Sequence, residues 1–144
     1  MATVKEMRLR LLKISVQEIA KKVFREAKSD AEELVRYQLL RGLRPDGEFI
    51  TPGYRMESYA RSKNQKNNRP PYGVPDLKDT GAFHRSIKME VKGDELVFDA
   101  TDEKWDDLRR KYSDVLGLTT ESGNEIAELT WSLFVDELKT LLKV

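Results

Sequence analysis

The sequence predicts an α+β fold with long N-terminal helices, a β-hairpin or small antiparallel sheet, and two C-terminal helices. Apolar residues recur at steps of three and four near both ends of the chain, which is the spacing of an amphipathic helix. Between these ends, residues 87–100 alternate apolar and polar side chains, as strands do. A length of 144 residues is typical of one domain. We therefore expect a single domain covering residues 1–144.

Two capping boxes and one apolar stripe define the N-terminal helical region. Ser15 with Glu18, and Ser29 with Glu32, have the spacing at which a hydroxyl and a carboxylate satisfy the first free amides of a helix. We expect a kink or a new helix near Ser29 and an end at Gly42, because glycine favours the C-terminus of a helix. The stripe that we expect to be buried consists of Leu9, Leu12, Val16, Ile19, Val23 and Ala27.

A long loop is predicted at about residues 44–76. It opens with the turn Pro45-Asp46-Gly47, in which proline presets one dihedral angle and glycine accepts a positive one. Neither helical nor strand periodicity is sustained after this turn. Loops of this length inside a domain are usually functional or disordered. Aromatic residues indicate that this one becomes partly ordered on a partner, and they are Tyr54, Tyr59 and Tyr72.

A β-hairpin follows this loop. Asp79 is placed to cap a short helical turn over residues 80–86, and Gly93-Asp94 fits a two-residue hairpin turn. Because an isolated two-stranded ribbon is only marginally stable, the hairpin must pack on the helices or join other strands, such as those of a neighbouring subunit. Of these two, we favour a ribbon completed by assembly. The inward-facing residues of the two strands are Ile87, Met89, Val91, Leu96, Phe98 and Ala100.

Two helices are predicted after the hairpin. Asp102 caps the first, which carries the stripe Trp105, Leu108, Tyr112 and Val115 and is expected to end at Gly117. The last helix runs from about residue 121 to residue 142 and has two apolar stripes. The first stripe, Ile126, Leu129, Leu133 and Leu141, serves the core. The second needs a partner, most simply a second subunit, and consists of Trp131, Val135, Leu138 and Leu142.

Charge is unevenly distributed, although the formal net charge is only +1. Residues 51–75 contain five basic residues and one acid, Glu57, whereas residues 94–107 contain seven acids and one base, Lys104. Blocks of opposite sign favour surfaces that meet each other, within or between subunits. The basic residues are also candidate nucleic-acid contacts, a less favoured alternative to a protein partner, and they are Arg55, Arg61, Lys63, Lys66 and Arg69.

Nothing in the sequence predicts catalysis or a cofactor. The chain has no cysteine, which removes thiol chemistry and disulfides and suits a reducing cytoplasm. His84 is the only histidine, so a metal cluster with Asp76 and Asp79 is a weaker interpretation than a loop residue and a helix cap. Phosphate-loop and dinucleotide motifs are absent. The first residues predict neither a signal peptide nor a membrane span. We expect a non-enzyme without metal or cofactor.

Two segments resemble motifs of small tailed-phage proteins. In the first, a leucine, a Thr-Gly pair, an apolar residue and a Ser-Ile pair precede a β-hairpin. The second is similar to the Gly-Leu-Ser/Thr element that opens the last helix in the Mu-like virion morphogenesis and tail-completion group, and here it contains Gly117. The positions that match the first motif are Leu77, Thr80, Gly81, Phe83, Ser86 and Ile87.

A further pattern resembles proteins of phages and prophages of Bacteroides-type gut bacteria. Its positions are Asp102, Lys104, Leu108, Lys111 and Tyr112. Together these resemblances cover the C-terminal half of the chain, whereas residues 46–74 depart from the shorter forms of the group.

These resemblances imply a structural subunit at the neck or tail-completion position of a phage particle. It would assemble as a homo-oligomeric ring with other head-to-tail proteins. We would then find it in the virion, and in the host cytoplasm during assembly.

Overall fold

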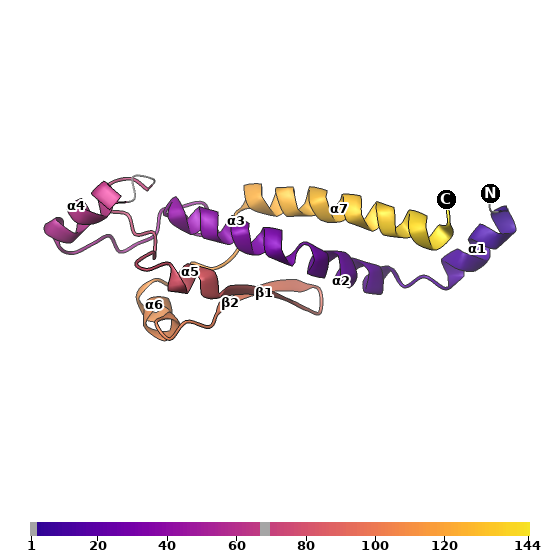
Figure 1. Ribbon diagram of the computed structural model, residues 1–144, viewed down its shortest axis with the longest axis horizontal. Helices are drawn as coiled ribbons and strands as arrows, with labels where there is room; N and C mark the ends of the chain where they lie inside the picture. The colour runs from indigo at the N-terminus through magenta and orange to yellow at the C-terminus, as the bar shows by residue number, and fades with distance from the viewer. Residues whose placement is uncertain (1–2, 67–69) are drawn as a thin grey trace.

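The computed structural model describes residues 3–66 and 70–144, without the side chains of residues 64–66. The molecule is elongated and has three layers over much of its length (Figure 1). Helices α2 and α3 form the middle layer, with the long helix α7 on one side and the hairpin of β1 and β2 on the other. Both termini lie at the same end (Figure 1). The predicted α+β class is therefore confirmed.

Three helices make up the N-terminal region: α1 (Val4–Leu12), α2 (Val16–Glu26) and α3 (Lys28–Leu40). The Ser15 hydroxyl accepts a hydrogen bond from the Glu18 amide at 3.3 Å and so caps α2, which confirms the hydroxyl half of the first predicted capping box. A helix boundary also lies near Ser29, but the second capping box is wrong, since α3 begins without a side-chain cap. Gly42 follows α3 with a φ of +74°, which confirms the predicted end.

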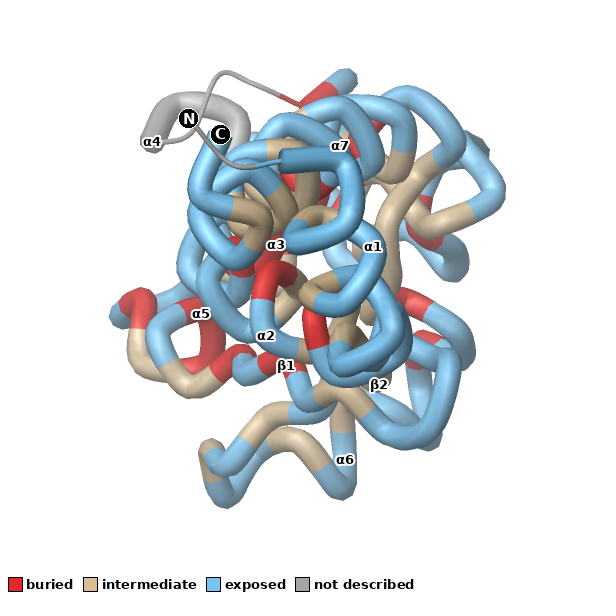
Figure 2. Tube along the Cα trace, turned by 90° about the vertical axis from the view of Figure 1, so that its right-hand side faces the viewer, coloured by how far each residue is buried: buried red, intermediate tan, exposed pale blue. Residues whose placement is uncertain are grey.

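Only half of the predicted N-terminal stripe is buried. Ile19, Val23 and Ala27 are buried, as expected. Leu12 and Val16 are instead 75% and 61% exposed, and Leu9 is exposed as well. The physical reason is that α1 diverges from the axis of α2, beyond the reach of the hairpin (Figure 1). Figure 2 shows the same contrast end on, with the buried red stretches lying on α2, α3 and β1 and the exposed blue tube on α1.

The predicted loop at residues 44–76 contains helix α4 (Glu57–Lys66), so the prediction of irregular structure throughout is wrong. The Ala60 side chain of α4 is buried. Tyr72 donates a hydrogen bond to Glu57, which ties the returning chain to the start of the helix. The opening turn is as predicted: Gly47 has a φ of +84° and its amide bonds the Arg44 carbonyl at 2.9 Å.

The short helix α5 (Ala82–Ser86) leads directly into the hairpin. It begins after Gly81, which has a φ of +89°, and Asp79 does not cap it, contrary to the prediction. The Thr80 hydroxyl accepts from the Ala82 amide instead. The Ser86 hydroxyl donates to the Phe83 carbonyl at 2.8 Å and closes the turn.

Strands β1 (Ile87–Lys92) and β2 (Glu95–Ala100) pair in antiparallel register, with residue 87 opposite residue 100 and residue 92 opposite residue 95. This confirms the predicted hairpin. Its outer edge on β1 is satisfied by side chains of α3 rather than by a third strand. The Glu32 carboxylate accepts from the Met89 amide at 2.8 Å, and Arg36 donates to the Ile87 carbonyl at 3.0 Å. Glu32, the residue predicted to complete a capping box, thus holds the sheet against the helices.

Two helices follow the hairpin: α6 (Trp105–Lys111) and α7 (Thr120–Leu142). Asp102 does not cap α6 directly, although its carboxylate accepts from the Lys104 amide at 2.9 Å. Helix α6 also ends before Tyr112 rather than at Gly117, because the chain must turn back across α3 before α7 begins. Gln38 of α3 holds this return, donating to the Gly117 carbonyl at 2.7 Å and accepting from the Thr119 amide.

The core lies between α3, the start of the hairpin and the segment after α6. Val35 and Leu39 of α3 pack against a cluster that also contains Ile50, Phe83, Ile87, Tyr112 and Val115. A second cluster joins α3, β1 and α7 through Ala31, Met89 and Ile126. Within the described residues, no helix combines the length and apolar character that a membrane crossing requires.

Candidate functional site

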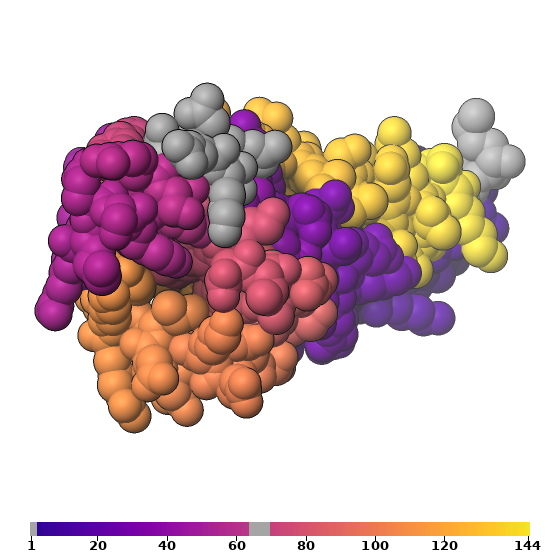
Figure 3. All heavy atoms as spheres, turned by 60° about the vertical axis from the view of Figure 1, so that its left-hand side comes forward, coloured from indigo at the N-terminus to yellow at the C-terminus, as the bar shows by residue number. Residues whose placement is uncertain are grey.

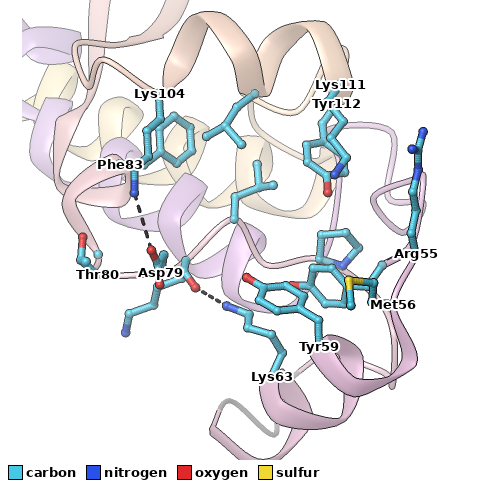
Figure 4. A pocket seen from close by; sticks show the side chains of 16 residues that line it. Arg55, Met56, Tyr59, Lys63, Asp79, Thr80, Phe83, Lys104, Lys111 and Tyr112 are labelled. Carbon is cyan, nitrogen blue, oxygen red and sulfur yellow. Dashed lines mark hydrogen bonds and ion pairs between the residues drawn. The ribbon is translucent and has the colours of Figure 1, made fainter.

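A pocket of about 430 Å³ opens at the end of the molecule where α4 and α6 meet. Its walls come from four places in the chain: residues 54–56, helix α4, the 75–81 segment with the start of α5, and helix α6. Figure 3 shows this end from outside, with the magenta atoms around α4 above the orange atoms of α6. Figure 4 shows the lining side chains from close by.

The walls of the pocket are largely aromatic and aliphatic. Tyr54 and Tyr59 meet edge to face, with ring centroids 5.0 Å apart. Phe83 and Tyr112 lie across from them, and Leu77 and other apolar side chains complete the lining. An apolar cleft with a few polar groups is the usual composition of a ligand site.

Five basic side chains surround the pocket and only one lining residue, Asp79, is acidic. Lys104 lies 3.6 Å from the Asp79 carboxylate, but both side chains are mostly exposed, so this ion pair is weak. The Lys111 ammonium lies 5.2 Å from the centre of the Tyr112 ring. The pocket therefore favours an anionic group at its mouth. The basic residues are Arg55, Lys63, Lys78, Lys104 and Lys111.

Asp76, the ion-pair partner of the lining residue Lys63, is almost completely buried, with 1% of its side chain exposed. Its carboxylate lies 2.8 Å from the ammonium of Lys63, whose side chain is 12% exposed, and it accepts from the Lys78 amide at 2.9 Å. Lys63 also donates to the Lys78 carbonyl. A buried charge must be paired to be tolerated, so Lys63 attaches α4 to the 75–81 segment and is committed to a structural contact.

His84 is buried and lies next to Asp76, the acidic member of this ion pair. Its Nε2 lies 2.7 Å from the Asp76 carbonyl, and its own carbonyl accepts from Arg36 at 2.6 Å. Burial lowers the pKa of His84, against the opposing effects of the Asp76 carbonyl and carboxylate. A neutral ring that donates to a carbonyl is a structural histidine. Among the described residues, no group of three or more potential ligands is placed to hold a metal ion.

The phenol of Tyr54 is half-buried at the same place. Burial raises its pKa well above the usual range, and the nearby Asp76 charge acts in the same direction. The phenol therefore stays protonated at neutral pH and offers the pocket a neutral hydrogen-bonding group rather than a base.

The structure brings together only part of the predicted basic loop. Arg55 and Lys63 line the pocket with Tyr54 and Tyr59. Arg61 does not line the pocket; it lies 3.6 Å from Glu57 of the same helix, and both side chains are exposed. The side chain of Lys66 and the whole of Arg69 lie outside the described residues.

Sequence reasoning missed three cations of the pocket: Lys78, Lys104 and Lys111. The sequence does contain a pattern that could have identified Lys104 and Lys111, because Lys104, Leu108 and Lys111 have the spacing of one helix face. Lys78 carried no such signal, since it reaches the pocket through the irregular 75–81 segment.

The outer face of α7 is a second candidate surface. Ser122, Ile126 and Thr130 form the buried face of this helix, and Trp131 on the opposite side is 66% exposed. The Trp131 ring stacks on Phe134, with centroids 5.9 Å apart. The other predicted interface residues of this stripe are half-buried: Val135, Leu138 and Leu142.

Comparison of the chain with protein-family models, curated proteins and solved structures finds no match.

Proposed function

We propose that this chain is a non-enzymatic structural subunit of a tailed-phage particle, at the neck or tail-completion position. It works by contacts with further copies, as a ring, and with other head-to-tail proteins. The proposal places it in the virion and, during assembly, in the host cytoplasm. It combines the sequence resemblance with a physical property of the fold, which is a large accessible surface that includes several exposed apolar side chains.

The observation that carries this proposal is the amount of surface left uncovered. The accessible surface is 9777 Å², whereas compact monomers of this mass have roughly 7,600 Å². The elongated three-layer shape accounts for the excess (Figure 1). A surplus of this size is what a subunit can bury against neighbours, because standard interfaces remove about 800 Å² from each partner.

The uncovered surface includes large apolar side chains close together in the chain. Contiguous exposed apolar residues mark interaction sites in soluble proteins. Trp131 belongs to the outer face of α7, and the others are on α1 and at the start of α2: Val4, Leu9, Leu11, Leu12 and Val16.

Replacing Trp131 with aspartate tests the proposal. The wild-type chain should show a discrete multimer by light scattering across a concentration series, and Trp131→Asp should weaken this association at least about 30-fold, as loss of an interface hot spot does. The stability of the monomer should change by less than about 0.5 kcal/mol, since the indole is mostly exposed.

The matched control is Tyr37→Asp, which changes an exposed helical aromatic on α3. It should leave the multimer intact. A wild-type chain that is monomeric at every concentration would contradict self-assembly, and equal losses in both variants would contradict a specific role for Trp131.

A nucleic-acid-associated accessory protein is the second candidate, and the pocket favours it. Cations with aromatic walls are the combination that binds single strands, through phosphate contacts and base stacking. Lys104 and Lys111 are the residues to change, because Lys63 is committed to Asp76.

A labelled single-stranded DNA tests this alternative by fluorescence anisotropy. With four phosphate contacts, affinity should fall roughly fifty-fold between about 50 and 200 mM salt. The double variant Lys104→Ala/Lys111→Ala should flatten this salt dependence. The control Lys92→Ala/Lys139→Ala should not, because both lysines are exposed and neither lines the pocket. If the affinity for single-stranded DNA changes neither with salt nor on replacement of Lys104 and Lys111, the nucleic-acid function is ruled out.

A further inference from the structure

We propose that the outer face of α7 in one copy docks into a groove between α2 and the hairpin tip of the next copy, with Trp131 as the anchor. This inference rests on the proposed ring subunit and names the two surfaces that meet. It concerns a second copy of this chain and no other partner.

The groove is a hollow of about 550 Å³ on the hairpin side of the molecule. Its apolar walls are Ala20 and Phe24 from α2 and Val91 and Leu96 from the hairpin, all half-buried. Lys21 lies at its edge. Asp94 of the hairpin turn lines the groove as well, so its polar rim carries one base and one acid. A half-buried apolar groove of this kind accepts an apolar side chain of a partner.

The groove continues into the exposed part of the N-terminal stripe. Val16, Ala20 and Phe24 follow one another at steps of four along α2, which aligns them as a ridge. Val16 begins α2 and is 61% exposed. Within the described residues, nothing of the same chain covers this end of the ridge. An entire helix face, rather than one side chain, is therefore needed to bury it.

The outer face of α7 has the complementary form. Trp131 is the largest exposed apolar side chain of the helix, and Val135 and Leu138 extend its stripe by further turns. A protruding tryptophan flanked by smaller apolar residues is the usual anchor of an interface, because it removes much apolar area at low entropic cost.

The helical segments that carry the two surfaces have opposite net charges. Helix α7 carries five acidic residues and one basic residue, whereas residues 4–26 carry seven basic and three acidic residues. Within the described part of the chain, Glu128 makes no ion pair, and neither does Lys21. Glu128 lies three residues before Trp131 and so borders the same face.

The same charges argue against pairing α7 with α7 of another copy. Such a contact would place the unpaired carboxylates of both helices close together, which costs free energy. The basic N-terminal helices of a neighbour are the better partner.

The two surfaces lie on opposite sides of the molecule. Helix α7 covers one side of α2 and α3, and the hairpin covers the other (Figure 1). A contact between two different surfaces repeats from copy to copy, and it closes into a ring when the rotation per copy divides a full turn. The proposed contact is therefore compatible with a ring and excludes a two-fold dimer built on this contact alone.

Because the chain has no cysteine, engineered cysteines test this contact directly. Gln17→Cys places a thiol at the groove, and Ser132→Cys places one beside Trp131 without removing it; both positions are exposed. The two variants are mixed and treated with a short bismaleimide. A cross-linked heterodimer should form in the mixture and in neither variant alone. A chain that carries both substitutions should give a ladder of cross-linked oligomers under the same treatment.

The control replaces Gln17→Cys with Ser29→Cys, an equally exposed position at the start of α3. This mixture should cross-link at least tenfold less. If light scattering shows a multimer but the groove mixture cross-links no better than the control, the docking contact is wrong and the ring subunit stands. If the chain stays monomeric and no cross-link forms, the docking contact and the ring-subunit proposal are both wrong.

Discussion

Asp76→Ala should destabilise the fold by about 3–5 kcal/mol, which is the usual cost of removing one partner from a buried ion pair. The change strands the Lys63 ammonium, which is 12% exposed and has no second carboxylate near it among the described contacts. It also removes the acceptor of the Lys78 amide. Both losses fall where α4 joins the 75–81 segment. Chemical denaturation followed by circular dichroism measures the effect as a lower midpoint.

The control for this prediction is Asp79→Ala. Asp79 is three residues away, but its side chain is 78% exposed and its ion pair with Lys104 is 3.6 Å long, so the cost should stay below about 0.5 kcal/mol. Adding Lys63→Met to Asp76→Ala should recover part of the lost stability, because it removes the stranded charge. Equal costs for the Asp76 and Asp79 variants would show that the buried pair is not what holds α4.

Phe83→Ala should cost about 3–5 kcal/mol, as truncation of a buried aromatic does. Phe83 is 4% exposed, belongs to the main core cluster and stacks on Trp105 with ring centroids 5.5 Å apart. Its removal leaves a cavity between α5 and α6 that the hairpin start, at Ile87, cannot fill without moving. The free energy of unfolding in urea measures the loss.

Phe49→Ala is the matched control, since this phenylalanine is 47% exposed and outside both core clusters. It should cost less than about 1 kcal/mol. A Phe83 variant as stable as the Phe49 variant would contradict the packing described for α5. The comparison also tests the role of Phe83 in the phage-like motif. A large loss of unfolding free energy would show that Phe83 is needed for core packing.

The sequence alone was sufficient for the elements with strong local signals. Alternating apolar residues around Gly93-Asp94 specified the hairpin, because strand faces repeat every two residues and the turn needs a glycine. The apolar spacing of residues 121–142 likewise specified α7. These patterns depend only on neighbours along the chain.

The tertiary structure decided the features that depend on distant residues. Helix α4 has no apolar period, and it is held by Lys63 on Asp76 and by Tyr72 on Glu57. Glu32 followed a capping-box pattern, but the unpaired edge of β1 lay within its reach and offered a buried amide.

The exposure of apolar side chains also depends partly on local sequence and partly on tertiary contacts. The spacing of Leu12 and Val16 defines an apolar face, but whether that face is covered depends on where other elements lie. The pocket likewise exists only because α4, the 75–81 segment and α6 converge. A sequence pattern determines which side of a helix is apolar, because that follows from local geometry. Only the assembled fold determines whether that side is in the core or remains for a partner, because burial depends on contacts between segments far apart in the chain.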